Sequence, residues 1–178
     1  EDKPRAFSIA NSPGEDEFIE LNVSLVENGK ATSWIHESLK VGDQLRFSGP
    51  YGRFYVRKSR RTPMLFLAGG SGLSSPKSMI LDLLENNDPG QEITLVYGAR
   101  NQSELYYRDL FESMAKQHNN FRYFPALSEE PNDSGWTGLR GYVHDAATSL
   151  YDGKFEGTTA YMCGPPPMID ACITSLMQ

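Results

Sequence analysis

The sequence has few cysteines, no long apolar run and no excess of positive charge. It contains only two cysteines, Cys163 and Cys172, which is too few for a disulfide framework. Two thiols also do not supply the roughly four that a plant-type iron–sulfur cluster needs. No apolar run approaches the roughly 20 residues that cross a bilayer, and no signal peptide is seen at Glu1. These absences favour a location in the reducing cytoplasm.

The charge and the histidines exclude further classes of function. The formal net charge of -6 argues against nucleic acid or an anionic membrane as a general partner. The three histidines His36, His118 and His144 lie far apart and lack metal-ligand spacing, so no metal site is expected.

The stretch from Met64 to Met79 is the most informative part of the chain. Its apolar start, residues 64–68, predicts a buried parallel strand. Gly69, Gly70 and Gly72 follow and allow a sharp turn, and then Ser74, Ser75 and Pro76 predict a helix start. A helix N-terminus after such a turn suits the pyrophosphate of a dinucleotide. The glycine pattern is only a variant of G-x-G-x-x-G, and a tight turn that binds nothing fits nearly as well.

The rest of the second half alternates between strand and helix patterns. We expect strands at 92–97, 121–127 and 159–163, helices at 103–118 (capped by Ser103), 143–150 and 168–177, and a long loop at 128–141. Alternation of this kind predicts a parallel sheet, whose ligands bind at the carboxyl ends of the strands. Four polar or glycine-rich segments should meet at that edge: residues 69–75, 98–100, the loop after Leu127, and 163–167.

The first part of the chain has a β-rich pattern. Alternating residues predict strands at 5–10, 18–26, 44–48 and 54–57, and Thr32 or Ser33 should cap a short helix containing Trp34. The charged stretch 58–63 has no apolar residue and is interpreted as a linker. We therefore expect one domain at residues 1–59 and a second at 60–178.

Three blocks in a fixed order resemble the ferredoxin–NADP reductase superfamily. They are Arg5-Ala-Phe-Ser8, Gly69-Gly-Ser-Gly-Leu-Ser-Ser-Pro76 and Cys163-Gly-Pro-Pro-Pro-Met168. Further blocks at 29–36, 48–52, 97–101, 104–108 and 141–147 resemble, more closely, the reductase components of multicomponent phenol hydroxylases. This resemblance implies a flavin-binding β-barrel followed by an α/β parallel-sheet domain that binds a nicotinamide dinucleotide.

The resemblance also implies parts that this chain does not contain. The barrel of the family begins with strands that precede the arginine block, so residues 1–59 are expected to be an incomplete barrel. A [2Fe–2S] domain is expected only in an N-terminal segment outside this sequence. We therefore expect the sequence to be a portion of a longer protein.

On the flavin side, the resemblance assigns roles to two segments. Arg5 would neutralise the FAD pyrophosphate, Ala6 and Phe7 would contact the flavin, and Ser8 would hydrogen-bond near flavin N5 as a catalytic residue. Gly29, Lys30, Ala31 and Thr32 would contact the pyrophosphate a second time. A strand with a buried Phe7 and a surface Arg5, and a helix cap at Thr32, are the plain alternatives.

On the nicotinamide side, the resemblance places Gly70, Ser71 and Gly72 against the cofactor, and Gly98 and Arg100 near the adenosine ribose. Cys163, with Gly164 and Pro165, would lie beside nicotinamide C4 as a positioning residue for hydride transfer, not as a nucleophile. Arg100 suits a 2′-phosphate, but the resemblance favours NADH over NADPH. A surface arginine and a buried strand-end cysteine are the alternatives.

These expectations combine into one functional hypothesis. Hydride would pass from NADH to FAD, and single electrons would pass through the [2Fe–2S] domain to a di-iron phenol or aromatic hydroxylase, the oxygenase partner. A reductase for a ring-hydroxylating dioxygenase or toluene monooxygenase is a second possibility. A module that senses NAD(H) without turnover is a third, and the presence of flavin would distinguish it.

Overall fold

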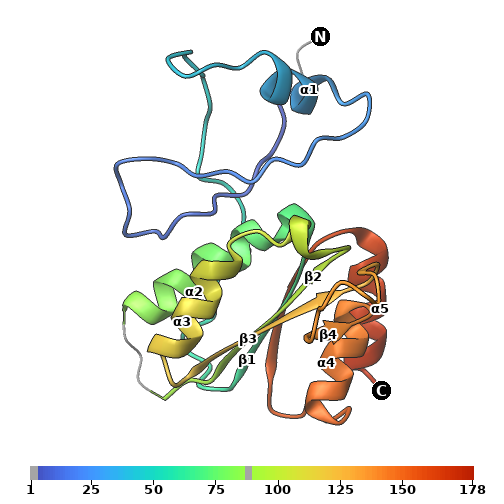
Figure 1. The fold of residues 1–178 in the computed structure, drawn as a ribbon. Coiled ribbons are helices and arrows are strands. Elements are labelled where there is room, and N and C mark those ends of the chain that lie inside the picture. The colour runs from blue at the N-terminus through green and yellow to red at the C-terminus, as the bar shows by residue number, and fades with distance from the viewer. Residues whose placement is uncertain (1–3, 87–89) are drawn as a thin grey trace.

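A computed structural model describes residues 4–86 and 90–178 of the chain. It consists of an N-terminal region, residues 4–62, and an α/β region, residues 63–178 (Figure 1). In the described residues, no helix is both long enough and apolar enough to cross a membrane.

The α/β region is built on a parallel sheet of five strands. They are β1 (Met64–Gly69), β2 (Ile93–Ala99), β3 (Phe121–Leu127), β4 (Leu139–Arg140) and β5 (Thr159–Cys163), in the order β4-β3-β2-β1-β5. The parallel sheet and its four longer strands confirm the sequence prediction. The prediction missed β4, which lies inside the expected loop, because two residues are too few to show an alternation.

Four helices cover the two faces of the sheet. They are α2 (Ser74–Glu85), α3 (Arg108–Gln117), α4 (Val143–Tyr151) and α5 (Pro166–Leu176). Helices α2 and α3 lie on one face, and α4 and α5 lie on the other (Figure 1). Strand β1 is buried on both sides: Phe66 packs with the α2–α3 layer, whereas Leu65 and Leu67 pack with the α4–α5 layer.

The start of α2 differs from the prediction. A 3₁₀ turn, η1 (Gly70–Leu73), leads directly into the helix, and Leu73 rather than a serine occupies the N-cap. The predicted caps Ser74 and Ser75 are instead inside the first helical turn, where the Ser74 hydroxyl donates to the Ser71 carbonyl at 3.0 Å. The turn Gly70–Leu73 already begins the helical winding, so α2 starts without a side-chain cap.

The start of α3 was also predicted too early. Residues Gln102–Glu104 form a separate 3₁₀ turn, η2, capped by the Asn101 side chain, which accepts from the Ser103 backbone N–H at 3.1 Å. The chain then reverses at Tyr107, whose φ of 55° is left-handed and prevents a continuous helix from residue 103. Helix α5 begins two residues before the predicted start, at Pro166, a residue type that suits a first helical turn.

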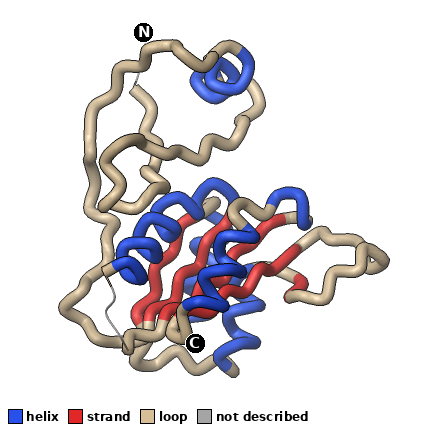
Figure 2. Tube along the Cα trace, turned by 60° about the vertical axis from the view of Figure 1, so that its left-hand side comes forward, coloured by secondary structure: helices blue, strands red, loops and turns tan. Residues whose placement is uncertain are grey.

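The N-terminal region contains one helix, α1 (Lys30–Glu37), and long irregular segments (Figure 2). The four predicted strands do not form ladders among the described residues. One antiparallel bridge, between Ile9 and Leu21, joins the first two segments. A strand is held by hydrogen bonds to neighbouring strands, and these residues supply such a neighbour at a single point. The predicted cap of α1 was wrong too, because Gly29 occupies the N-cap.

The two regions are joined by contacts around the predicted linker. The side chain of Gln91 donates to the carbonyls of Arg60 and Thr62, at 3.0 and 2.7 Å. The Arg57 backbone N–H donates to the Tyr161 hydroxyl at 2.9 Å, and Val56 joins the α2–α3 core. The charged stretch is therefore tied to the α/β region along its length.

Candidate functional site

The carboxyl ends of the strands bring the predicted nicotinamide segments together. Gly69 of β1 pairs with Gly98 of β2, and Ala68 pairs with Cys163 of β5. On the other side of β2, the loop after β3 joins the edge, because the Glu129 backbone N–H donates to the Arg100 carbonyl at 2.8 Å. The convergence of the four segments at one edge was predicted and is present.

The glycine turn packs against the Cys163 loop so closely that a side chain has no room at Gly72. A Cβ there would lie 2.5 Å from the Cys163 carbonyl oxygen and 2.7 Å from Gly164 Cα. At Gly69, a Cβ would lie 2.6 Å from the Met168 sulfur. Glycine at these positions therefore lets the turn and the β5 loop form one continuous backbone surface.

Gly70 has a different role in the turn. Its φ of 53° is left-handed, and a Cβ added there would meet nothing within 4 Å. The outer side of the turn is thus open, as a bound nucleotide requires. The hydroxyl of Tyr97, which β2 holds in the core, donates to the Gly70 carbonyl at 3.3 Å and helps to fix the turn. Sequence reasoning missed this tyrosine because it reads as one more core residue of the strand.

Cys163 lies half-buried at the end of β5, beside the turn. Burial raises the pKa of its thiol above the ordinary value, so the group is protonated at neutral pH. A neutral thiol is a poor nucleophile. This state agrees with the predicted positioning role. Cys172 is buried on α5 among the core residues, and both cysteines are free thiols.

Arg100 follows β2 and is held by a carboxylate. Its Nε donates to Glu104 Oε2 at 3.0 Å and its Nη2 to Glu104 Oε1 at 2.5 Å, a bidentate ion pair at the protein surface. The hydrogen bond from Arg100 lowers the pKa of Glu104, so this carboxylate stays ionised. The arginine at the predicted ribose site therefore carries its own counterion.

The predicted flavin residues lie in the N-terminal region, not at the sheet edge. Arg5, Ala6 and Ser8 are exposed and Phe7 is half-buried, so the segment presents an open surface. The second segment, residues 29–32, begins α1: Lys30 is exposed, Ala31 is half-buried, and the Thr32 hydroxyl donates to the Gly29 carbonyl at 3.2 Å. The two halves of the predicted site thus belong to different regions of the chain.

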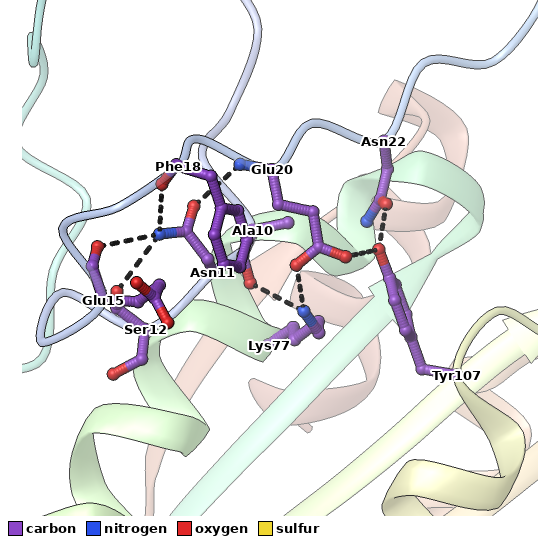
Figure 3. Close-up of polar contacts among 9 residues, drawn as sticks. All are labelled: Ala10, Asn11, Ser12, Glu15, Phe18, Glu20, Asn22, Lys77 and Tyr107. Carbon is purple, nitrogen blue, oxygen red and sulfur yellow. Dashed lines mark hydrogen bonds and ion pairs between the residues drawn. The ribbon is translucent and has the colours of Figure 1, made fainter.

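A polar cluster between the two regions was not predicted (Figure 3). It joins Glu20 to Lys77 of α2 and to Tyr107, the N-cap of α3. A signal was present in the sequence, because Lys77 shares the apolar face of its helix with Ile80 and Leu84, at spacings of three and seven residues. A lysine on the buried face of a helix indicates a buried partner.

The described residues contain no group of three or more His, Cys, Asp or Glu side chains that could hold a metal ion. The chemistry of the edge is that of backbone N–H groups, a neutral thiol and one ion pair.

Family comparisons match this two-part organisation. The model of the oxidoreductase NAD-binding domain matches residues 66–173, which include the whole glycine turn and the Cys163 loop. The chain belongs to this family. The model of the oxidoreductase FAD-binding domain matches residues 1–55, so the family's NAD-binding domain is preceded here by its flavin-binding counterpart.

Individual relatives of the family cover nearly all of the chain. The reductase component of phenol 2-monooxygenase from Pseudomonas sp. (strain CF600) is 58% identical over 177 residues, 99% of this chain and 50% of that protein. The phenol hydroxylase P5 protein of Acinetobacter pittii (strain PHEA-2) is 54% identical over 174 residues, 98% of this chain and 49% of that protein. The chain thus spans about half the length of these curated relatives.

A solved structure has the same arrangement. A cytochrome P450 reductase from Amycolatopsis superposes with a TM-score of 0.87 at 31% identity, covering 96% of this chain and 51% of that one. The fold of a flavin-binding domain followed by an α/β nicotinamide domain, expected from the resemblance, is therefore confirmed. In residues 4–62 of this chain, the predicted strands of the flavin-binding domain form no ladder.

The residues at the edge fit a nicotinamide dinucleotide. The open outer side at Gly70 leaves room for a ligand, and Gly72 gives the turn a surface free of side chains. In the N-terminal region, the exposed Arg5 and Ser8 and the half-buried ring of Phe7 are groups that a flavin and its phosphates can contact.

Proposed function

We propose that the chain is the flavin- and nicotinamide-binding part of a reductase that takes hydride from NADH and delivers electrons to an oxygenase. The observation that carries this proposal is the joint edge formed by the glycine turn and the Cys163 loop, in a chain that both domain models match. When bound, the nicotinamide supplies a hydride, and the flavin accepts it and releases electrons singly.

The residues of the chain contribute position rather than acid–base chemistry. Gly70, Ser71 and Gly72 would hold the nicotinamide end through the backbone, with Gly164 and Pro165 forming the opposite wall. Cys163 would keep a small, neutral side chain next to the reacting carbon. Arg5, Ala6, Phe7 and Ser8 would hold the flavin, Ser8 at N5, and Gly29, Lys30, Ala31 and Thr32 would hold its phosphates.

The ion pair at the end of β2 supports NADH as the coenzyme. Gly98 and Arg100 would border the adenosine ribose, where NADPH carries a 2′-phosphate. Glu104 already neutralises Arg100 with both of its oxygens and would repel an added phosphate. A ribose hydroxyl, in contrast, can donate to a carboxylate.

The partner and substrate follow from the relatives by analogy. One relative is named as the reductase component of phenol 2-monooxygenase and the other as a phenol hydroxylase protein, so we propose an aromatic hydroxylase as the electron acceptor, through a [2Fe–2S] domain outside this sequence. The two free thiols are compatible with the cytoplasm as the location. We further propose the division of the chain into functional domains at residues 1–59 and 60–178.

The visible spectrum of the purified full-length protein tests the proposal. Flavin bands that bleach on anaerobic addition of NADH would support hydride transfer, and a parallel titration with NADPH would identify the preferred coenzyme. A protein that binds NADH but shows no flavin band, even after FAD is added, would instead be a sensing module.

A further inference from the structure

Three side chains from separate elements meet where the N-terminal region lies on the α/β region (Figure 3). Lys77 Nζ of α2 donates to Glu20 Oε2 at 2.5 Å, and the Tyr107 hydroxyl donates to Glu20 Oε1 at 2.6 Å. Both oxygens of one carboxylate are therefore used, one by Lys77 of α2 and the other by Tyr107, the N-cap of α3. We call Glu20, Lys77 and Tyr107 the clamp.

Lys77 is the buried member of the clamp. Its side chain is 6% exposed, whereas that of Glu20 is 28% exposed. A buried ammonium needs compensation on several sides, and here it also donates to the Ala10 carbonyl at 3.2 Å and lies 4.3 Å from the Tyr107 ring centroid. Burying a charge with this many specific partners fixes the geometry of the segments that supply them.

The donors and acceptors around the Tyr107 hydroxyl determine the orientation of the Asn22 amide. The Tyr107 hydroxyl contacts both Glu20 Oε1 and Asn22 Oδ1, at 2.6 and 2.5 Å, but has only one proton to donate. If the proton goes to the carboxylate, the Asn22 amide must turn its Nδ2 toward the tyrosine oxygen. That orientation also gives a partner to the buried Asn22 Nδ2, which otherwise lacks one among the described residues.

The chain pays a conformational cost to place Tyr107 in the clamp. With φ at 55°, this bulky residue adopts the left-handed region that L-residues other than Asn and Asp rarely enter. The strain lies where α3 begins and directs the ring toward the N-terminal region. Strain of this kind persists only when surrounding contacts hold it.

The clamp is adjacent in sequence to both halves of the proposed site. Lys77 lies five residues after Gly72 on the same helical unit, and its acceptor Ala10 lies two residues after Ser8. We propose that Lys77, Glu20 and Tyr107 are positioning residues that fix the flavin-holding segment relative to the nicotinamide turn, so that donor and acceptor meet at transfer distance. This inference rests on the proposed function.

The test compares variants of the full-length, FAD-loaded protein. Lys77→Met removes the charge but leaves Glu20 without its cation, and Glu20→Met/Lys77→Met removes both charges together. Tyr107→Phe keeps the ring and removes one hydrogen bond, so it is the mild variant. Lys58→Met is the matched control, since Lys58 also bonds a carboxylate of α2, Asp82 at 2.7 Å, but its side chain is 57% exposed.

Two measurements are made on each variant. Stopped-flow reduction of the flavin at saturating NADH gives the transfer rate, and its dependence on NADH concentration gives the dissociation constant. Hydrogen exchange at the amides of Ala10 and Glu20 reports on the docking of the segment independently of activity, because these amides are bonded at 2.8 and 2.9 Å within it.

We expect Lys77→Met and the double variant to lower the transfer rate by about tenfold or more, since small misplacements of reacting groups are costly. The dissociation constant for NADH should stay within about twofold, and exchange at Ala10 and Glu20 should accelerate. The double variant should recover the thermal stability that Lys77→Met loses, but not its rate. Tyr107→Phe should show a smaller loss in the same direction, and Lys58→Met none.

Recovery of the rate together with stability in the double variant would overturn the positioning role and leave a structural one. Unchanged rates in both Lys77→Met and Tyr107→Phe would do the same. Should the parent protein show no flavin reduction at all, the proposed function itself would fail, whereas faster exchange in the variants would still establish the clamp as the link between the regions.

Discussion

The two regions of the molecule use similar sequence patterns with different results. In the α/β region, apolar strands such as β1 are entirely buried, with Phe66 and Leu67 at 0% exposure. In the N-terminal region, the alternating segments leave large apolar side chains in the open, including Phe47 at 72% and Leu25 at 56%. Strand β1 has two parallel neighbours, β2 and β5, whereas the segments of residues 4–62 meet at a single bridge between Ile9 and Leu21. A pattern therefore predicts a strand only where its partner is also present.

Paired substitutions of phenylalanine test this contrast most strongly. Phe66→Ala should lower the free energy of unfolding of the chain by about 3–5 kcal/mol, because it opens a cavity in a core where Phe66 stacks on Tyr161 with ring centroids 5.1 Å apart. Phe47→Ala should change it by about 0.5 kcal/mol or less. Urea unfolding followed by far-UV circular dichroism gives both values. Equal losses would show that the N-terminal apolar face is covered in solution.

Glycine substitutions sharpen the comparison at the level of the backbone. Gly72→Ala should cost about 1–3 kcal/mol, because its Cβ would meet backbone atoms of Cys163 and Gly164 that have no freedom to move apart. Gly29→Ala should cost less. The nearest atom to its Cβ, at 2.6 Å, is the Thr32 hydroxyl oxygen, which a side-chain rotation can displace. The Val26 carbonyl oxygen lies at 2.9 Å, whereas all three nearest atoms at Gly72 are backbone atoms within 2.7 Å. Thermal unfolding of the two variants measures the difference, and a larger loss at Gly29 would contradict the view that the α/β region is the less yielding one.

The preference for NADH over NADPH should depend on residues of the α/β region alone. Glu104→Gln removes the counterion of Arg100 and frees the guanidinium for a 2′-phosphate, so the ratio of kcat/KM for NADPH to that for NADH should rise about tenfold, or roughly 1.4 kcal/mol. Glu112→Gln is the control, because it breaks a similar surface pair with Arg108, at 2.7 Å, on α3. An unchanged ratio in Glu104→Gln would place coenzyme selection elsewhere.

The sequence predicted the secondary structure best where that structure depends on residues close together in the chain. The apolar runs of β1, β2, β3 and β5 and the turn between β1 and α2 were found because their patterns are complete within a few residues. The helix starts were less accurate, since η1 and the left-handed Tyr107 depend on how the chain packs. The clamp was missed altogether. Its members Glu20 and Lys77 lie 57 residues apart, so the position of Lys77 on a buried helix face could indicate a partner, but only the fold identifies that partner as Glu20.

The smallest expected effect concerns pH and the link between the two regions. Burial alone would raise the pKa of Glu20, but the hydrogen bonds from Lys77 and Tyr107 outweigh it, so the pKa lies below the ordinary 4.5. A carboxyl whose pKa is lowered in the folded state stabilises the fold at pH values above its unfolded-state pKa. This contribution is lost as the pH falls through its folded-state pKa.

In urea unfolding, the parent should therefore be more stable than Glu20→Gln above pH 4.5, and this difference in the free energy of unfolding, the gap, should narrow as the pH falls below 4.5. The effect should be modest because solvent reaches the carboxylate and screens the pair. A gap that is constant with pH would mean that the charge of Glu20 does not hold the N-terminal region on α2, and that hydrogen bonds to an uncharged side chain at this position suffice.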